Sequence, residues 1–236
     1  MQILKKAWPI YILLIHILMF AVLWKSNFIE KAAERLGFTQ QSELSEFYHL
    51  MTSYHKRMDA SVPAGATIFI GDSITQSLAS SAVSPVSVNY GIGGDTTLGV
   101  INRLPIYESI NRARAVVIAI GVNDLPLRSN LLIVENVRTI LESIPAGRAI
   151  VLNAVLPLDE SISAIKASNS RIVSLNAALA KLSEEFDNVI FLDMRSDLED
   201  ASGNLRDHFH TGDGVHLSAA GYELWIAQLR QILTGV

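Results

Sequence analysis

The sequence has no cysteine among its 236 residues. The chain therefore cannot form disulfides, use a thiolate nucleophile or bind zinc through cysteine ligands. It also has no excess of positive charge, because 19 lysines and arginines stand against 23 aspartates and glutamates, for a formal net charge of -4. Since binding to nucleic acid depends on a basic surface, we expect no nucleic-acid partner.

Charge is absent altogether from one long segment, residues 7–24, which reads AWPIYILLIHILMFAVLW. Eighteen helical residues rise roughly 27 Å, close to the thickness of the hydrocarbon core of a bilayer. A tryptophan stands near each end, as at membrane interfaces, and Lys5 and Lys6 precede the run. We predict that residues 1–25 are a single-pass membrane anchor with the N-terminus in the cytoplasm. The rest of the chain is then extracytoplasmic, and periplasmic in a Gram-negative cell.

A cleaved signal peptide is the main alternative to an anchor. Such a peptide has small residues at its cleavage site, whereas this run ends in Leu-Trp-Lys-Ser-Asn. A retained anchor is therefore the favoured interpretation, and secretion after cleavage stays open.

The remainder of the chain has the length of one domain and contains no internal repeats. Residues 26–62 are predicted to be a helical linker, because apolar side chains recur at helical spacing around Glu43–Met58. A break containing Pro and Gly follows at 61–65. The main domain is expected to span 63–236.

Short apolar runs alternate with helical patterns throughout this domain. The runs are continuous rather than alternating, which is typical of parallel strands buried on both faces. The predicted strands are Thr67–Ile70, Val86–Tyr90, Ala115–Ile120, Ala149–Val155 and Val189–Leu192. This order predicts an α/β sandwich with a five-stranded parallel sheet, whose functional residues gather at the carboxyl ends of the strands.

Glycine and small polar residues follow each of the first three predicted strands. These blocks are Gly71-Asp72-Ser73, Gly91-Ile92-Gly93-Gly94-Asp95 and Gly121-Val122-Asn123-Asp124. A fourth block, Asp213-Gly214-Val215-His216, precedes the last predicted helix. If the strands are parallel, the four blocks meet at one edge of the sheet.

The residue types in these blocks suit acyl transfer. A serine hydroxyl such as that of Ser73 needs a base, and imidazole is suited to that task. A carboxylate three residues before His216 can reach the other ring nitrogen and fix the tautomer. The N–H groups of Ser73 and Gly94 and the amide of Asn123 can bind the oxyanion.

The four blocks, in this order, resemble those of the SGNH (GDSL) hydrolase superfamily. The segment from Asn89 to Thr97 is especially similar to the platelet-activating-factor acetylhydrolase-like branch. The resemblance implies a flavodoxin-like three-layer sandwich that hydrolyses esters without a cofactor. It also implies roles for the matching residues, with catalytic Ser73, Asp213 and His216 and an oxyanion hole of Ser73, Gly94 and Asn123. The third block lacks the second glycine that many members have.

Two other kinds of site are disfavoured. The glycine block lacks the third glycine of a dinucleotide fingerprint and follows the second strand rather than the first. The Asp and His residues between Asp207 and His216 include potential metal ligands, but they lack the helical i, i+4 histidine pair of metalloproteases. We expect no metal, and the roles of His208 and His210 stay open.

The expected function is hydrolysis of a short-chain acyl ester, with acetyl preferred, carried by a glycan, a lipid or a small molecule. Transfer of the acyl group to an extracytoplasmic polysaccharide is the alternative, because the same triad serves both reactions. A non-catalytic module tethered to the membrane is a third possibility, which the complete set of signature residues disfavours. The sequence leaves the alcohol moiety and the oligomeric state open.

Overall fold

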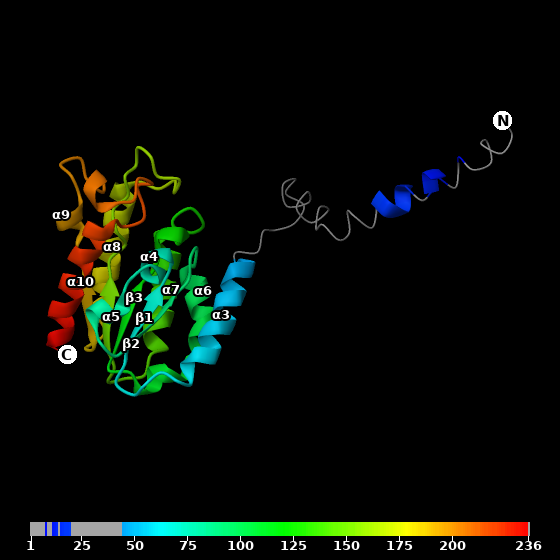
Figure 1. The fold of residues 1–236 in the computed structure, drawn as a ribbon. Coiled ribbons are helices and arrows are strands. Elements are labelled where there is room, and N and C mark those ends of the chain that lie inside the picture. The colour runs from blue at the N-terminus through cyan, green and yellow to red at the C-terminus, as the bar shows by residue number, and fades with distance from the viewer. Residues whose placement is uncertain (1–7, 9–10, 14, 20–43, 236) are drawn as a thin grey trace. The chain divides into compact units, whose positions relative to one another are not determined.

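The computed structural model describes residues 8, 11–13, 15–19 and 44–235 (Figure 1). The chain divides into two units, Met1–Glu43 and Leu44–Val236. The second unit contains the sheet and all the sequence blocks described above. It is described by itself below.

The predicted anchor at 7–24 falls largely outside the described residues. Those of its residues that are described, at 8, 11–13 and 15–19, are helical. Among the described residues, no helix has both the length and the apolar character needed to cross a bilayer. The anchor therefore stays a prediction from the sequence.

The second unit is built on a five-stranded parallel sheet with the order β2-β1-β3-β4-β5. The strands are β1 (Thr67–Gly71), β2 (Ser87–Gly91), β3 (Ala115–Ala119), β4 (Ala149–Asn153) and β5 (Val189–Leu192). The α/β fold with five parallel strands is thus confirmed. Strand β5 has its predicted bounds, and the other four differ by one or two residues at one or both ends. Strands β1 and β2 run on to Gly71 and Gly91, whereas β3 and β4 end earlier, where the chain turns into the loops of the site.

Helices cover both faces of the sheet. They are α3 (Glu46–Asp59), α4 (Ser73–Gln76), α5 (Ser80–Val83), α6 (Thr97–Arg103), α7 (Asn130–Glu142), α8 (Asn169–Ser183), α9 (Arg195–Leu198) and α10 (Ala219–Thr234). The chain moves from β1 to β2 in one direction along the sheet and from β2 to β5 in the other. Right-handed crossovers therefore place α5 on one face and α6, α7 and α8 on the other. Helix α10 contacts α5, which completes three layers (Figure 1).

The compact unit begins at Leu44, earlier than the predicted boundary at residue 63. The cause is helix α3, which buries Tyr48, His55 and Asp59 against the domain. The Asp59 carboxylate accepts hydrogen bonds from the Tyr90 hydroxyl at 2.8 Å and from the Ser109 N–H at 3.0 Å. A helix held by buried polar contacts is part of the domain rather than a linker.

Candidate active site

Ser73 is the first residue of the short helix α4, and only Asp72 separates it from the end of β1. The Asp72 side chain caps this helix by accepting the Ile74 N–H at 2.9 Å. From α10, the Tyr222 hydroxyl donates to the Ile74 carbonyl at 2.7 Å. These contacts fix the turn that carries the Ser73 hydroxyl, which is partly exposed.

The structure brings Ser73, His216 and Asp213 together. The distance from Ser73 Oγ to His216 Nε2 is 2.9 Å, and His216 Nδ1 lies 2.5 Å from Asp213 Oδ2. The other oxygen of Asp213 accepts the N–H groups of Val215 at 3.0 Å and His216 at 2.9 Å. A serine hydroxyl, an imidazole and a carboxylate thus form one hydrogen-bonded chain.

The charge state of Asp213 fixes the direction of these hydrogen bonds. Burial tends to raise the pKa of Asp213, but the hydrogen bonds from His216 and Val215 outweigh it and lower the pKa to about 2. An ionised carboxylate only accepts, so His216 Nδ1 carries the hydrogen. Nε2 of the neutral ring is then free to accept the proton of Ser73.

The glycine block lies beside α4. A side chain at Gly91 would overlap the backbone of Gln76, with its Cβ 2.2 Å from the Gln76 nitrogen, so the close approach requires glycine. The Gln76 side-chain oxygen accepts the Gly93 N–H at 2.6 Å. Gly94 is exposed, with φ +74° and open space around it. Backbone conformation rather than crowding by the protein therefore explains glycine at this position.

The third block is joined to the glycine block through Asn123. Its side-chain amide donates to the Asp95 carbonyl at 2.9 Å. The Asp95 carboxylate accepts its neighbour's N–H, from Thr96, at 2.9 Å. Asp124 accepts the Thr97 N–H at 3.0 Å. Both carboxylates therefore hold loops in place.

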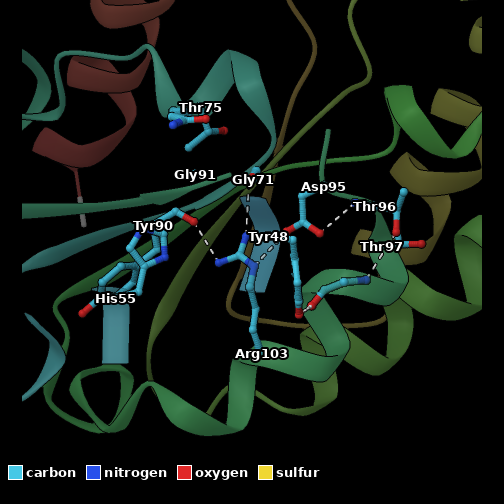
Figure 2. Close-up of polar contacts among 12 residues, drawn as sticks. Tyr48, His55, Gly71, Thr75, Tyr90, Gly91, Asp95, Thr96, Thr97 and Arg103 are labelled. Carbon is cyan, nitrogen blue, oxygen red and sulfur yellow. Dashed lines mark hydrogen bonds and ion pairs between the residues drawn. The ribbon is translucent and has the colours of Figure 1, made fainter. Parts of the chain in front are cut away.

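A buried arginine connects the ends of the first two strands (Figure 2). Arg103, on α6, donates to the Asp95 carboxylate at 2.8 Å, the Tyr90 carbonyl at 2.8 Å and the Gly71 carbonyl at 3.1 Å. Its Nη1 also donates a hydrogen bond to the Tyr107 hydroxyl oxygen at 2.9 Å. Both members of the Arg103–Asp95 ion pair are fully buried. The pair thus fixes the segments that carry Ser73 and Gly94.

Asp72 is buried next to Ser73 and is not part of the hydrogen-bonded chain that joins Ser73 to Asp213. Burial raises its pKa to about 7, against the effect of the Ile74 N–H, and the nearby Asp95 carboxylate raises it further. A neutral Asp72 adds no negative charge beside the site where an oxyanion would form.

The family model for the GDSL-like lipase/acylhydrolase family matches residues 69–224, most of the compact unit. The chain belongs to this family. It is an ester hydrolase of the SGNH type, and the resemblance drawn from its sequence blocks is confirmed.

The chain is also similar to one curated protein and, in fold, to two solved structures. The human platelet-activating factor acetylhydrolase IB subunit alpha2 is 27% identical over 195 residues, which cover 77% of this chain and 82% of the relative. A platelet activating factor protein from Streptococcus pneumonia is 24% identical, with a TM-score of 0.76 over 86% of this chain and 98% of the other. An acetylxylan esterase from Geobacillus stearothermophilus is 23% identical, with a TM-score of 0.56 over 71% and 95%.

All the predicted site residues of this family member lie at the carboxyl edge of the sheet. Three residues that support the site through hydrogen bonds were not predicted from the sequence, namely Arg103, Gln76 and Tyr222. The sequence contains one signal for Arg103. It is a charged residue at the end of a largely apolar helical segment that closely follows Asp95. Of the two open histidines, His208 is exposed and His210 is buried.

Proposed function

We propose that the chain hydrolyses short-chain acyl esters, acetyl esters above all, through an acyl-enzyme on Ser73. The observation that carries the proposal is the contact of Ser73 Oγ with His216 Nε2 at 2.9 Å, with Asp213 on the opposite ring nitrogen. Nucleophilic acyl transfer needs a base within reach of the serine hydroxyl, and it needs that base to be held in the correct tautomer.

The reaction proceeds in two halves. Ser73 Oγ attacks the ester carbonyl as its proton passes to His216 Nε2, and the carbonyl oxygen becomes an oxyanion. The Ser73 and Gly94 N–H groups and the free amide hydrogen of Asn123 bind that oxyanion. His216 then protonates the leaving alcohol. Water, deprotonated by His216, attacks the acyl-enzyme, and the acid leaves as Ser73 regains its proton.

A cavity of about 20 Å³ lies behind the turn that carries Ser73. Its lining includes Asp72 and Ile74, which flank Ser73, together with Val122 and Trp225, but not Ser73 itself. The acyl length is therefore inferred from the relatives rather than from this cavity. The named activities of the acetylxylan esterase and of the platelet-activating factor acetylhydrolase subunit support an acetyl ester. We propose an acetylated glycan, lipid or small molecule as the substrate.

For the location we propose a membrane anchor at residues 7–24 with the catalytic unit outside the cytoplasm. The support is the uncharged run and the lysines before it, as argued from the sequence. Fractionation of cells that express the full chain tests this. The protein should stay with the membrane in carbonate wash, and recovery as a shortened soluble form would favour a cleaved signal peptide.

The activity is tested with the full chain on p-nitrophenyl esters of increasing acyl length and on acetylated glycans. We expect turnover to be fastest for acetate and to be abolished by Ser73→Ala. The exposed Ser174→Ala on α8 serves as the control and should keep full activity. A fluorophosphonate probe should label the parent and not Ser73→Ala. Equal labelling of both would contradict the proposal.

The same experiment separates hydrolysis from transfer. His216 and Asp213 are both about half exposed, which gives bulk water access to the acyl-enzyme and favours hydrolysis. If an added glycan acceptor captures most of the acetyl group instead of acetate being released, acyl transfer is the function.

A further inference from the structure

His210 makes an unusual pair of contacts with the loop that carries Asp213. Its Nδ1 accepts the N–H of Gly212 at 3.0 Å and the N–H of Gly214 at 3.3 Å. These are the residues immediately before and after Asp213. The imidazole ring is almost fully buried, with 3% of its side chain exposed. One buried nitrogen therefore holds the backbone on both sides of the triad carboxylate.

The same contacts define the tautomer of His210. Because the Nδ1 lone pair faces two N–H donors, the neutral ring carries its hydrogen on Nε2. That nitrogen lies 3.6 Å from Asp207 Oδ1 and 3.7 Å from Asp159 Oδ2, and it has no hydrogen-bond partner among the described residues. The N–H thus points between two carboxylates.

This tautomer excludes the ligand role that the cluster would otherwise suggest. Asp159, Asp207 and His210 each offer an atom within 4.8 Å of the others, as a metal site would. A metal at His210 Nε2 would need the lone pair there and a hydrogen on Nδ1, which would face the N–H groups of Gly212 and Gly214. The contacts of the ring therefore argue for a different function.

The surrounding loop shows what the ring supports. His210 pairs with Leu217 as an isolated antiparallel bridge, and the Thr211 N–H donates to the His216 carbonyl at 2.9 Å. Asp213 and His216 lie inside the short hairpin closed in this way. On its other side, the Gly214 carbonyl accepts the Asp159 N–H at 2.9 Å. The hairpin is thus fastened both to the β4 loop and to the ring of His210.

We propose that His210 is a positioning residue for the triad, which acts by holding Asp213 at the distance and angle that orient His216. The inference rests on the proposed function, since it assigns a role in the same site. His210 touches no reacting atom, so its effect passes through Asp213. A small displacement of an orienting group lowers kcat, whereas it changes the binding of the substrate, and hence KM, much less.

Two variants of His210 test this, because each places a polar atom at the position of a different ring nitrogen. In His210→Asn, the side-chain oxygen takes the place of Nδ1 and can still accept from Gly212 and Gly214. In His210→Gln, the polar atoms reach the place of Nε2 and the acceptor at Nδ1 is lost. We expect His210→Gln to lower kcat by about 10- to 100-fold with little change in KM, and His210→Asn to stay within about threefold of the parent.

A spectroscopic measurement covers the case in which a variant does not fold. Long-range proton–nitrogen correlation in the full parent chain reports which nitrogen of His210 carries the hydrogen. We expect it on Nε2, with Nδ1 bare, in the absence and presence of added Zn²⁺. A hydrogen on Nδ1, or a Zn²⁺-dependent shift of Nε2 at one equivalent, would overturn the proposal.

The outcomes also separate this proposal from the proposed function. If Ser73→Ala abolishes turnover while His210→Gln and His210→Asn show equal kcat, only the positioning role is wrong. If Ser73→Ala stays active, the triad itself is wrong. A loss of melting temperature in His210→Gln without a fall in kcat assigns His210 to stability alone and rejects positioning.

Discussion

The side-chain amide of Asn123 donates a 2.9 Å hydrogen bond to the backbone carbonyl of Asp95. This bond joins the loop after β3 to the glycine block after β2. An asparagine amide has two hydrogens, so one holds the loops together and the other stays available for an oxyanion. The spacing of the proposed oxyanion hole is thus set by one of its own donors.

Replacing Asn123 by aspartate should remove both functions of the amide. The variant Asn123→Asp keeps the shape but has no N–H group, and its carboxylate faces the Asp95 carbonyl. We expect kcat to fall by about 10²- to 10³-fold with a small change in KM. Steady-state kinetics on an acetyl ester measure this. The control is Asn188→Asp, which loses a structural bond to the Arg148 carbonyl. A fall of less than tenfold in Asn123→Asp would contradict the oxyanion role.

The buried Arg103–Asp95 pair should make a large difference to stability when only one partner is removed. Arg103→Met leaves the Asp95 carboxylate buried without its cation, which should cost about 3–5 kcal/mol of unfolding free energy. The double variant Arg103→Met with Asp95→Asn should recover part of this loss, because no charge is left unpaired. Urea unfolding measures both variants.

An exposed ion pair supplies the matched control for Arg103. Arg138 and Glu185 lie 2.8 Å apart with 38% and 49% of their side chains exposed. We expect Arg138→Met to change stability far less than Arg103→Met, because solvent screens an exposed pair. Equal effects of Arg103→Met and Arg138→Met would show that the buried pair does not hold the site together.

Asp72 should make the stability of the protein depend on pH. Its ordinary pKa is 3.8, and burial raises the pKa in the folded state to about 7. Between these values the folded state binds a proton that the unfolded state has lost. The stability contributed by Asp72 is therefore complete below about pH 4 and is lost as the pH rises to about 7.

The variant Asp72→Asn tests this dependence. Asparagine is also a good helix cap and can still accept the Ile74 N–H, but it cannot ionise. We expect the variant to gain stability relative to the parent between pH 5 and pH 8, measured by urea unfolding at both values. Asp193→Asn, at an exposed carboxylate that accepts the Arg195 N–H at 2.8 Å, is the control. A constant difference between parent and Asp72→Asn across this range would count against the buried neutral carboxyl.

The Asp213 carboxylate should be needed for the orientation of His216 rather than for folding. Asp213→Asn keeps the side-chain shape but offers an N–H group to His216 Nδ1, which favours the wrong tautomer. We expect kcat to fall by roughly 10⁴-fold, less than the loss in Ser73→Ala. The melting temperature should fall only modestly at neutral pH, since the lowered pKa of Asp213 means that its ionised form stabilises the folded state but the group is half exposed. An activity within tenfold of the parent would remove Asp213 from the triad.

Much of the fold could be predicted because its signals are local. A parallel strand buried on both faces is a continuous apolar run, and Val189–Leu192 was placed at its observed bounds. The glycine that ends a strand and the polar residues after it lie in the same few positions. Ser73, Gly94 and Asn123 could therefore be placed at the same edge of the sheet without knowing the strand order.

The supports of the site could not be predicted because their partners are remote in the sequence. Arg103 meets groups at positions 71, 90, 95 and 107, and only the folded sheet brings these together. The residues around His210 resembled metal ligands in the sequence, and only the direction of two N–H groups decides its tautomer. Helix α3 was assigned to a linker for the same reason, since its buried partners lie some fifty positions away.

The two contacts of the triad span very different lengths of chain. Asp213 and His216 are three positions apart within one closed hairpin, whereas Ser73 and His216 are separated by 143 positions. The Asp213–His216 contact is therefore local to one hairpin, whereas the Ser73–His216 contact depends on how α10 and the hairpin before it are placed against α4. A change at the Tyr222–Ile74 contact between α10 and α4 would alter the second distance and leave the first unchanged.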